Sequence, residues 1–252
     1  MREIFRKLPE FDYDFLEQIE SEYRLSVGVE NIGAWLDRFG QLAEAVARGA
    51  GTYRQVEDHL FELKVIRFLE VVCRSTEIAY EPTGIEPRAE KCDLTATYRS
   101  DRYLVEMKCF HPNWRDTRIP VERIAAGNKV IMNGPVYHQY QATRGHLIDR
   151  VFETERKFAN YSAGAQKVLA VPVGFHLNLE DLRDFIFIYR NGRPRADDPL
   201  GPMTLHNMPR PFSGTIDHFW ALPFMQESFS FAPHATPTLV APEIANDRTI
   251  TA

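Results

Sequence analysis

DLTATYRSDRYLVEMKCF, residues 93–110, is the stretch of sequence that decides the fold. Apolar and polar residues alternate with a period of two over 93–99 and over 102–110, on either side of Ser100-Asp101. Alternation of this kind is typical of β-strands, and a short polar break between two such runs is typical of a hairpin. We therefore predict two antiparallel strands joined by a two-residue turn at Ser100-Asp101.

The register of this hairpin predicts which side chains share a face of the sheet. With that turn, Asp93 lies opposite Lys108, and Thr95 lies opposite Glu106. Residues two apart on a strand share a face, so Asp93, Glu106 and Lys108 project from the same side. Asp93 and Glu106 become diagonal neighbours, about 7–8 Å apart. Ionisable groups on an apolar strand pair are costly unless they bind something, which makes these three candidate functional residues.

Helices and strands alternate in the sequence on both sides of the hairpin. Apolar residues at helical spacing or in short runs predict helices over 10–24, 30–48, 52–74 and 140–160, and strands over 77–81, 168–175 and 184–190. A turn of helix is expected over 178–183 and a short helix near 121–126. This order favours an α/β (α+β) protein in which helices flank a mixed β-sheet.

The chain is expected to form one globular unit with three parts. Residues 1–51 are predicted to be a helical layer, 52–192 the core domain, and 193–252 an extended C-terminal arm. The arm is suggested by proline, because 9 of the 16 prolines lie after residue 193. Its content of phenylalanine is higher than that of a typical disordered tail, so the arm is expected to pack on the core or on a partner.

Composition and charge restrict the function. The formal net charge of −5 argues against a protein coated in nucleic acid, but residues 64–167 are locally positive, at +4, between acidic ends. An odd number of cysteines without a Cys-x-x-Cys pair speaks against a disulfide framework and favours a reducing, cytoplasmic setting. No secretory signal and no membrane-spanning run is found, so neither secretion nor membrane insertion is expected.

The candidate residues and their order resemble the PD-(D/E)xK nuclease superfamily, whose fold is called restriction-endonuclease-like. The resemblance covers residues 53–175 and is carried by Asp93, by Glu106-Met107-Lys108, and by Glu62 on the helix that precedes the strands. The chain departs from the pattern at Cys92, which stands where the superfamily's name has proline. Other acid-x-Lys triplets, Glu62-Leu63-Lys64 and Glu155-Arg156-Lys157, lie on predicted helices, where residues two apart do not share a face.

The resemblance implies metal-dependent hydrolysis of phosphodiester bonds by an endonuclease, with DNA favoured over RNA. Asp93 and Glu106 would bind Mg²⁺ or Mn²⁺, with the backbone carbonyl of Met107 as an extra ligand. Lys108 would orient or deprotonate the attacking water, and Glu62 would hold a second metal ion or a metal-bound water. Oxygen ligands of this kind suit Mg²⁺ or Mn²⁺ better than zinc.

Contacts outside the site are also expected. The phosphate backbone would be bound by arginines of the irregular segment that follows the hairpin, Arg115, Arg118 and Arg123. The helical N-terminus and the C-terminal arm would supply substrate specificity or the contacts of a homodimer.

Two other functions stay open. The chain is either a nuclease or a binding or regulatory module that keeps a restriction-endonuclease-like fold without catalysis, and metal binding separates the two. A third interpretation is an unrelated hydrolase that uses the acids for general acid–base chemistry, in which case activity would survive EDTA.

Overall fold

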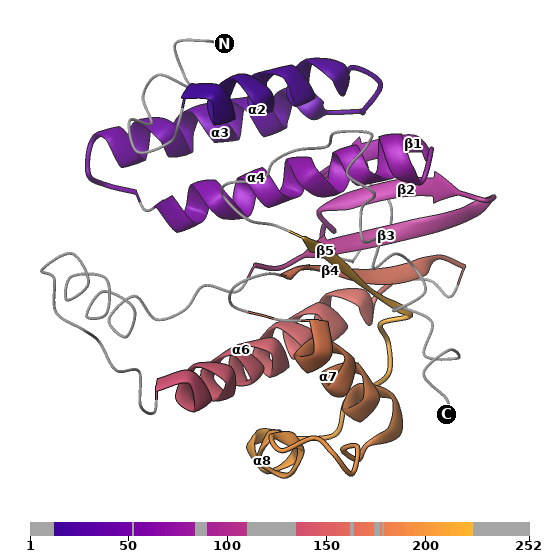
Figure 1. Cartoon of the computed structure of the whole chain (residues 1–252). Coiled ribbons are helices and arrows are strands. Elements are labelled where there is room, and N and C mark those ends of the chain that lie inside the picture. Colours follow the sequence, from indigo (N-terminus) through magenta and orange to yellow (C-terminus); the bar gives the residue numbers. More distant parts are fainter. Residues whose placement is uncertain are drawn as a thin grey trace, which may run out of the picture.

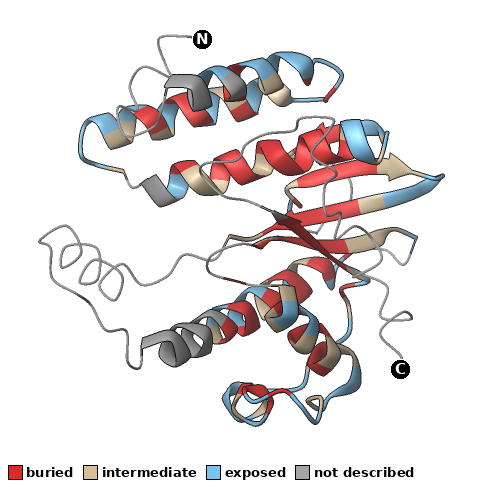
Figure 2. Cartoon of the chain, in the orientation of Figure 1, coloured by how far each residue is buried: buried red, intermediate tan, exposed pale blue. Residues whose placement is uncertain are grey.

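The computed structural model describes residues 13–51, 53–83, 90–109, 135–161, 164–173, 177 and 179–223. These residues form a five-stranded mixed sheet with helices on both faces (Figure 1). Buried residues concentrate on the strands and on the sides of the helices that face them (Figure 2). The prediction of an α/β protein in which helices flank a mixed sheet is therefore confirmed.

The sheet combines antiparallel and parallel pairing. Its strands lie in chain order: β1 (Thr76–Tyr80), β2 (Leu94–Tyr98), β3 (Asp101–Met107), β4 (Gln166–Val173) and β5 (His218–Pro223). β1–β2 and β2–β3 are antiparallel, whereas β3–β4 and β4–β5 are parallel. A parallel pair needs a crossover, and helices supply both crossovers in this sheet.

The hairpin forms, but its turn lies one residue earlier than predicted. Tyr98 pairs with Asp101, so the turn residues are Arg99 and Ser100, at φ 50° and 70°. Positive φ at both positions gives a turn whose twist matches that of the strands, and turns of this type are the preferred two-residue connections in β-hairpins. The pairing is therefore shifted by two residues, and Thr95 faces Leu104 instead of Glu106.

A shift of two leaves every side chain on its predicted face, because side chains alternate with a period of two. Leu104 contributes to the core on one side of the sheet, and Val105 to the core on the other side. Carried one residue beyond the ladder, the register places Asp93 opposite Glu106 instead of Lys108. The two carboxylates thus come closer together than predicted.

The N-terminal helices form one layer. They are α2 (Tyr13–Leu25), α3 (Ile32–Ala47) and α4 (Tyr53–Arg67), and α4 continues as one turn of π-helix, η1 (Phe68–Val72). Trp35 of α3 stacks on His59 of α4, at a ring distance of 4.7 Å. The predicted helices agree with these bounds to within a few residues. As predicted, α3 ends near Gly49, whose φ is 70°.

The second layer contains α6 (Pro135–Phe158), α7 (Leu179–Asn191) and α8 (Gly201–Asn207). The strand predicted over 184–190 is wrong, because this segment belongs to α7. Its isoleucines and aromatic residues favour strands, but Leu182, Phe185, Ile186 and Tyr189 are buried at helical spacing. Packing of that face against the sheet decides in favour of the helix.

The prediction of an extended arm from residue 193 is wrong for residues 193–223. These residues form α8 and β5, and β5 pairs in parallel with β4 along its whole length. Trp220 and Leu222 enter the core beside the N-terminal helices, whereas Phe219 and Ala221 enter the core beside α6 and α7. Two of the aromatic residues that suggested a packed arm, Phe219 and Trp220, therefore belong to a strand that is buried on both faces. Residues 224–252 lie outside the described part, as does the helix predicted near 121–126.

Candidate functional site

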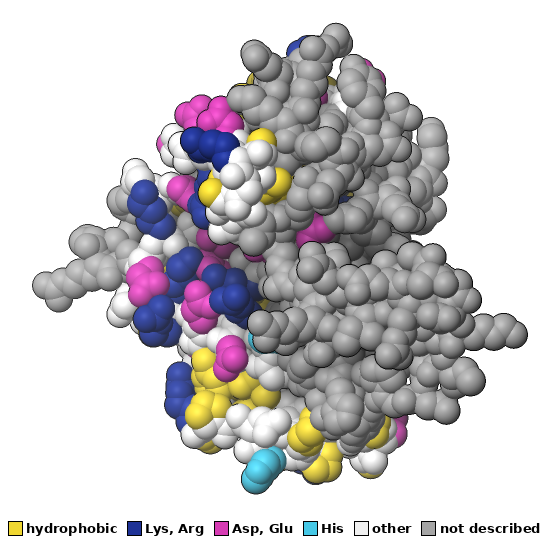
Figure 3. Space-filling view, turned by 90° about the vertical axis from the view of Figure 1, so that its left-hand side faces the viewer, with side chains coloured by type: hydrophobic (Ala, Val, Ile, Leu, Met, Phe, Trp, Pro, Cys, Tyr) yellow, Lys and Arg dark blue, Asp and Glu magenta, His cyan; other side chains and the backbone are white. Residues whose placement is uncertain are grey.

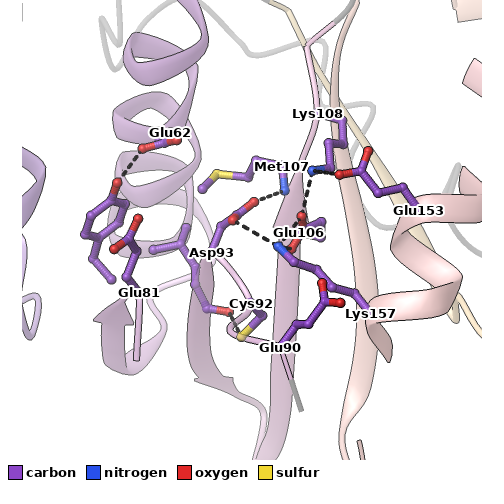
Figure 4. A network of polar contacts seen from close by, with 12 residues as sticks. Glu62, Glu81, Glu90, Cys92, Asp93, Glu106, Met107, Lys108, Glu153 and Lys157 are labelled. Carbon is purple, nitrogen blue, oxygen red and sulfur yellow. Dashed lines mark hydrogen bonds and ion pairs between the residues drawn. The ribbon is translucent and has the colours of Figure 1, made fainter. Parts of the chain in front are cut away.

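Asp93, Glu106 and Lys108 lie together where β2 begins and β3 ends (Figure 4). The side chain of Glu106 is completely buried, whereas 17% of the Lys108 side chain is exposed. Nζ of Lys108 lies 2.8 Å from Oε1 of Glu106. The structure thus brings together the three residues that the hairpin places on one side of the sheet.

Backbone contacts hold Asp93 in position. The N–H of Met107 donates a hydrogen bond to Oδ2 of Asp93, at 2.6 Å. The carbonyl oxygen of Asp93 accepts a hydrogen bond from the N–H of Glu81, at 2.8 Å. Asp93 is therefore fixed between β3 and the segment that follows β1. The carbonyl group of Met107 as a metal ligand stays a prediction.

Lys157, near the end of α6, completes the site and was not predicted. Its Nζ donates hydrogen bonds to both carboxylate oxygens of Glu106, at 2.6 and 2.7 Å. The same atom lies 3.7 Å from Oδ1 of Asp93. One ammonium group from a helix therefore contacts both carboxylates from the hairpin (Figure 4).

A second α6 residue reaches the site from one turn earlier. Oε1 of Glu153 lies 3.3 Å from Nζ of Lys108, and Arg150 contacts the other oxygen of Glu153 at 2.8 Å. Glu153 and Lys157 are four residues apart and so lie on one side of the helix. The sequence already places Arg150, Glu153 and Lys157 on one polar side of the helix, where a backbone phosphate could bind, but a solvated helix face is the more common interpretation of such a pattern.

The carboxylates and lysines shift each other's ionisation. Burial raises the pKa of Asp93 to about 7, together with the charge of Glu106, while Lys157 and the N–H of Met107 act in the opposite direction. Burial lowers the pKa of Lys108 and Lys157, but the neighbouring carboxylates outweigh it, so both pKa values lie above the ordinary value. The site is a buried carboxylate, Glu106, with two ammonium groups bound to it and the partly exposed carboxyl group of Asp93 beside it.

Glu62 lies on α4, across the start of β2 from this cluster, and its carboxylate is turned elsewhere (Figure 4). Its Oε2 accepts a hydrogen bond from the hydroxyl of Tyr80 at 2.7 Å and lies 2.8 Å from Nδ1 of His59. The charge of Glu62 is near enough to contribute to the raised pKa of Asp93. The structure therefore places Glu62 beside the site but in contact with other side chains.

Residues behind the site connect it to the end of α6. The hydroxyl of Tyr161 accepts a hydrogen bond from the N–H of Cys92, at 3.1 Å, and donates one to the carbonyl oxygen of Glu90. The Cys92 side chain is buried, and burial raises its thiol pKa to about 12. Cys92 therefore acts as a small apolar residue, and the hydrogen bond of its N–H helps to fix the backbone directly before Asp93 in the sequence.

The donor atoms present suit a hard divalent cation that keeps part of its water shell. Among the described residues, no group of three or more His, Cys, Asp and Glu side chains is arranged to hold a metal ion. Asp93 and Glu106, however, already converge on a single cationic atom, Nζ of Lys157. Mg²⁺ is typically bound through one or two carboxylates, with waters and substrate phosphates completing its octahedron. The pair fits that requirement, and it does not fit a closed zinc site.

The surface on one side of the described part has mixed charge. Lys and Arg side chains alternate there with Asp and Glu side chains (Figure 3). An alternating surface of this kind does not favour indiscriminate binding of nucleic acid. The predicted phosphate contacts Arg115, Arg118 and Arg123 lie outside the described residues.

In the described part of the chain, no helix is both long and apolar enough to cross a membrane. Comparisons of this chain with family models, with curated proteins and with solved structures gave no match.

Proposed function

We propose that the chain is a metal-dependent nuclease that hydrolyses phosphodiester bonds, with DNA as the expected substrate. The observation that carries this proposal is the convergence of Asp93 and Glu106 on one cation position, with Lys108 bound beside them. Hydrolysis of a phosphodiester needs charge stabilisation around a phosphorus centre, and two carboxylates that hold a divalent cation beside an ammonium group supply it.

The order of elements supports the same proposal. A helix bearing Glu62, three antiparallel strands, a crossover helix and a parallel strand follow one another in α4, β1, β2, β3, α6 and β4. The resemblance to the PD-(D/E)xK superfamily is based on this same order of elements. Asp93 lies at the start of the second strand, and Glu106 and Lys108 lie at the end of the third, where the two antiparallel strands bring them together.

Each residue has a distinct part in the proposed reaction. Asp93 and Glu106 would bind Mg²⁺, which supplies an activated water and neutralises charge on the phosphate. The N–H of Met107 orients Asp93, and the ladder to β4 continues beyond β3 through the N–H of Lys108 and the carbonyl oxygen of Ala170, at 3.0 Å. Lys108 would donate a hydrogen bond to the attacking water or to a phosphate oxygen, since its ammonium group lies at the edge of the site.

The test is a cleavage assay of the purified chain with Mg²⁺ or Mn²⁺ on plasmid, linear, single-stranded and RNA substrates. Asp93→Asn and Glu106→Gln should abolish cleavage. Asp101→Asn is a matched control, because it removes an exposed carboxylate from the far end of β3. Cleavage that survives EDTA or the Glu106→Gln change would overturn the proposal.

One observation favours the second function, a binding module without catalysis. Lys157 already neutralises Glu106, so the pair does not require a metal ion for charge balance. Such a module would show no Mn²⁺ binding in calorimetry and no cleavage, with or without Asp93 and Glu106. The nuclease is preferred because the cluster lies at a partly exposed edge and includes Lys108.

A further inference from the structure

The ammonium group of Lys157 occupies the position that a metal ion would need. It contacts both oxygens of Glu106 at 2.6 and 2.7 Å, and Oδ1 of Asp93 is 3.7 Å away. These are the carboxylates to which the proposed function assigns the metal ion. A magnesium ion on the same oxygens would lie about 2.0–2.1 Å from them, closer than a hydrogen-bonded ammonium.

Glu106 cannot be left without a cation. Its side chain is fully buried, and a buried carboxylate without a partner is strongly disfavoured. Lys108 contacts only Oε1, whereas Lys157 contacts both oxygens. Lys157 is therefore the main counter-ion of the buried carboxylate in the structure.

A metal ion and this ammonium group exclude each other. Both need the same oxygen lone pairs, and two cations this close in a largely buried site repel one another strongly. Lys157 can leave because its charge stands on a flexible four-carbon chain, and 16% of its side chain already reaches solvent. Glu153, one turn earlier on α6, lies on the same side of the helix as Lys157 and is half-buried.

We propose that Lys157 is the resident cation of the Asp93–Glu106 pair, and that a divalent metal ion binds only by displacing its ammonium group. This inference rests on the proposed metal site and adds a regulatory step to it. The site without metal is stable and charge-balanced, and the affinity for metal is lower than the two carboxylates alone would give. The displaced ammonium group remains on α6 at the edge of the site, where a phosphate oxygen can accept its hydrogen bond.

The first measurement is the affinity of the full chain for Mn²⁺ by calorimetry, in the wild type and in Lys157→Met. Methionine keeps much of the side-chain volume and removes the competing charge. We expect Lys157→Met to bind Mn²⁺ about tenfold more tightly, or more, because the metal no longer competes with a buried ion pair. Arg156→Met is the matched control, since it removes the same charge from the neighbouring residue, whose side chain is 68% exposed. It should change the affinity by less than about twofold, as exposed charges are largely screened.

The second measurement needs no variant and so does not depend on the folding of Lys157→Met. Trace acylation of the wild-type chain, followed by mass spectrometry, reports how accessible each lysine is. Saturating Mg²⁺ should increase the modification of Lys157 and leave that of the exposed Lys91 unchanged. Unchanged or reduced modification of Lys157 in a chain that binds Mg²⁺ would overturn the proposed displacement.

The outcomes separate this inference from the proposed function. If the wild type binds Mn²⁺ and Lys157→Met binds it equally or more weakly, the displacement is wrong and the nuclease proposal stands. If only Lys157→Met binds Mn²⁺, Lys157 is the resident cation, but no metal ion displaces it in the wild-type chain, so the displacement and the nuclease proposal both fail. If neither binds Mn²⁺, both proposals fail.

Discussion

Helix α6 contributes a cation to each of two ion-pair clusters, and the two clusters differ in how they are built. In the first, Arg144 lies among Asp181, Asp184 and Asp198, at 3.4, 3.6 and 2.8 Å. In the second, Lys157 lies between Glu106 and Asp93. The side chain of Arg144 is 2% exposed, whereas the side chains of both lysines of the site are 16–17% exposed at its edge.

The difference indicates which cluster maintains the fold and which is available for chemistry. A guanidinium group is planar and permanently charged, and it binds several carboxylates in a fixed geometry. Arg144 connects α6 to α7 and to the segment before α8 in this way. A lysine carries its charge on a flexible four-carbon chain. The contacts of Lys108 and Lys157 with the carboxylates of the hairpin can therefore be exchanged for those of a ligand.

The largest expected effect is the loss of stability when Arg144 is removed. Arg144→Met leaves the fully buried Asp198 without its main partner and should lower the free energy of unfolding by about 3–5 kcal/mol. Urea denaturation measures this change. Arg150→Met, on the same helix but 48% exposed, should cost less than about 0.5 kcal/mol. Equal losses in the two variants would contradict the comparison.

The site should show the opposite pattern. Lys108→Met should reduce cleavage about 10²–10⁴-fold, which is the usual contribution of a group that positions or transfers a proton. Its free energy of unfolding should fall by no more than about 1–2 kcal/mol, because Glu106 retains Lys157. Kinetics and urea denaturation on one preparation measure both. Unfolding of Lys108→Met would mean that the site is as structural as the Arg144 cluster.

The two clusters also differ in how far the sequence predicted them. The side of the sheet shared by Asp93, Glu106 and Lys108 followed from the period of two, which survived an error of two residues in the register. Lys157 did not follow, because it is 51 residues from Glu106 and no local pattern links them. The pairing of Arg144 with Asp198 was not predicted either, because 54 residues separate them and no local pattern links them. Local periodicity predicts elements and faces, whereas contacts between layers depend on tertiary packing.

The misread segments follow the same rule. Residues 184–190 are rich in strand-forming residues, and only the sheet beneath them favours α7. The strand β5 was not predicted, because the surrounding prolines suggested an extended arm, although the aromatic residues of the segment indicated burial.

A smaller effect is a pH dependence of stability caused by Asp93. In the unfolded chain this carboxyl titrates near 3.8, and in the folded chain its pKa is about 7. Between these values the folded state binds more protons, so this group lowers stability as the pH rises through that window. Asp93→Asn removes the titrating group and should be more stable than the wild type at pH 8 in EDTA, with the gap closing towards pH 4. Urea denaturation across this range measures it, and a gap that does not vary with pH would contradict the raised pKa.

The smallest effect concerns Glu62, which lies beside the site but contacts Tyr80 and His59. Tyr80 is 1% exposed, so Tyr80→Phe fits the same space and removes only the hydroxyl that donates to Glu62. The loss of that hydrogen bond should cost about 1 kcal/mol of unfolding free energy, with cleavage within about threefold of the wild type. Because Glu62 keeps its carboxylate in this variant, a larger fall in cleavage would indicate that the orientation of that carboxylate matters. Such a fall, in a chain that still folds, would place Glu62 in the chemistry of the site instead of in the support behind it.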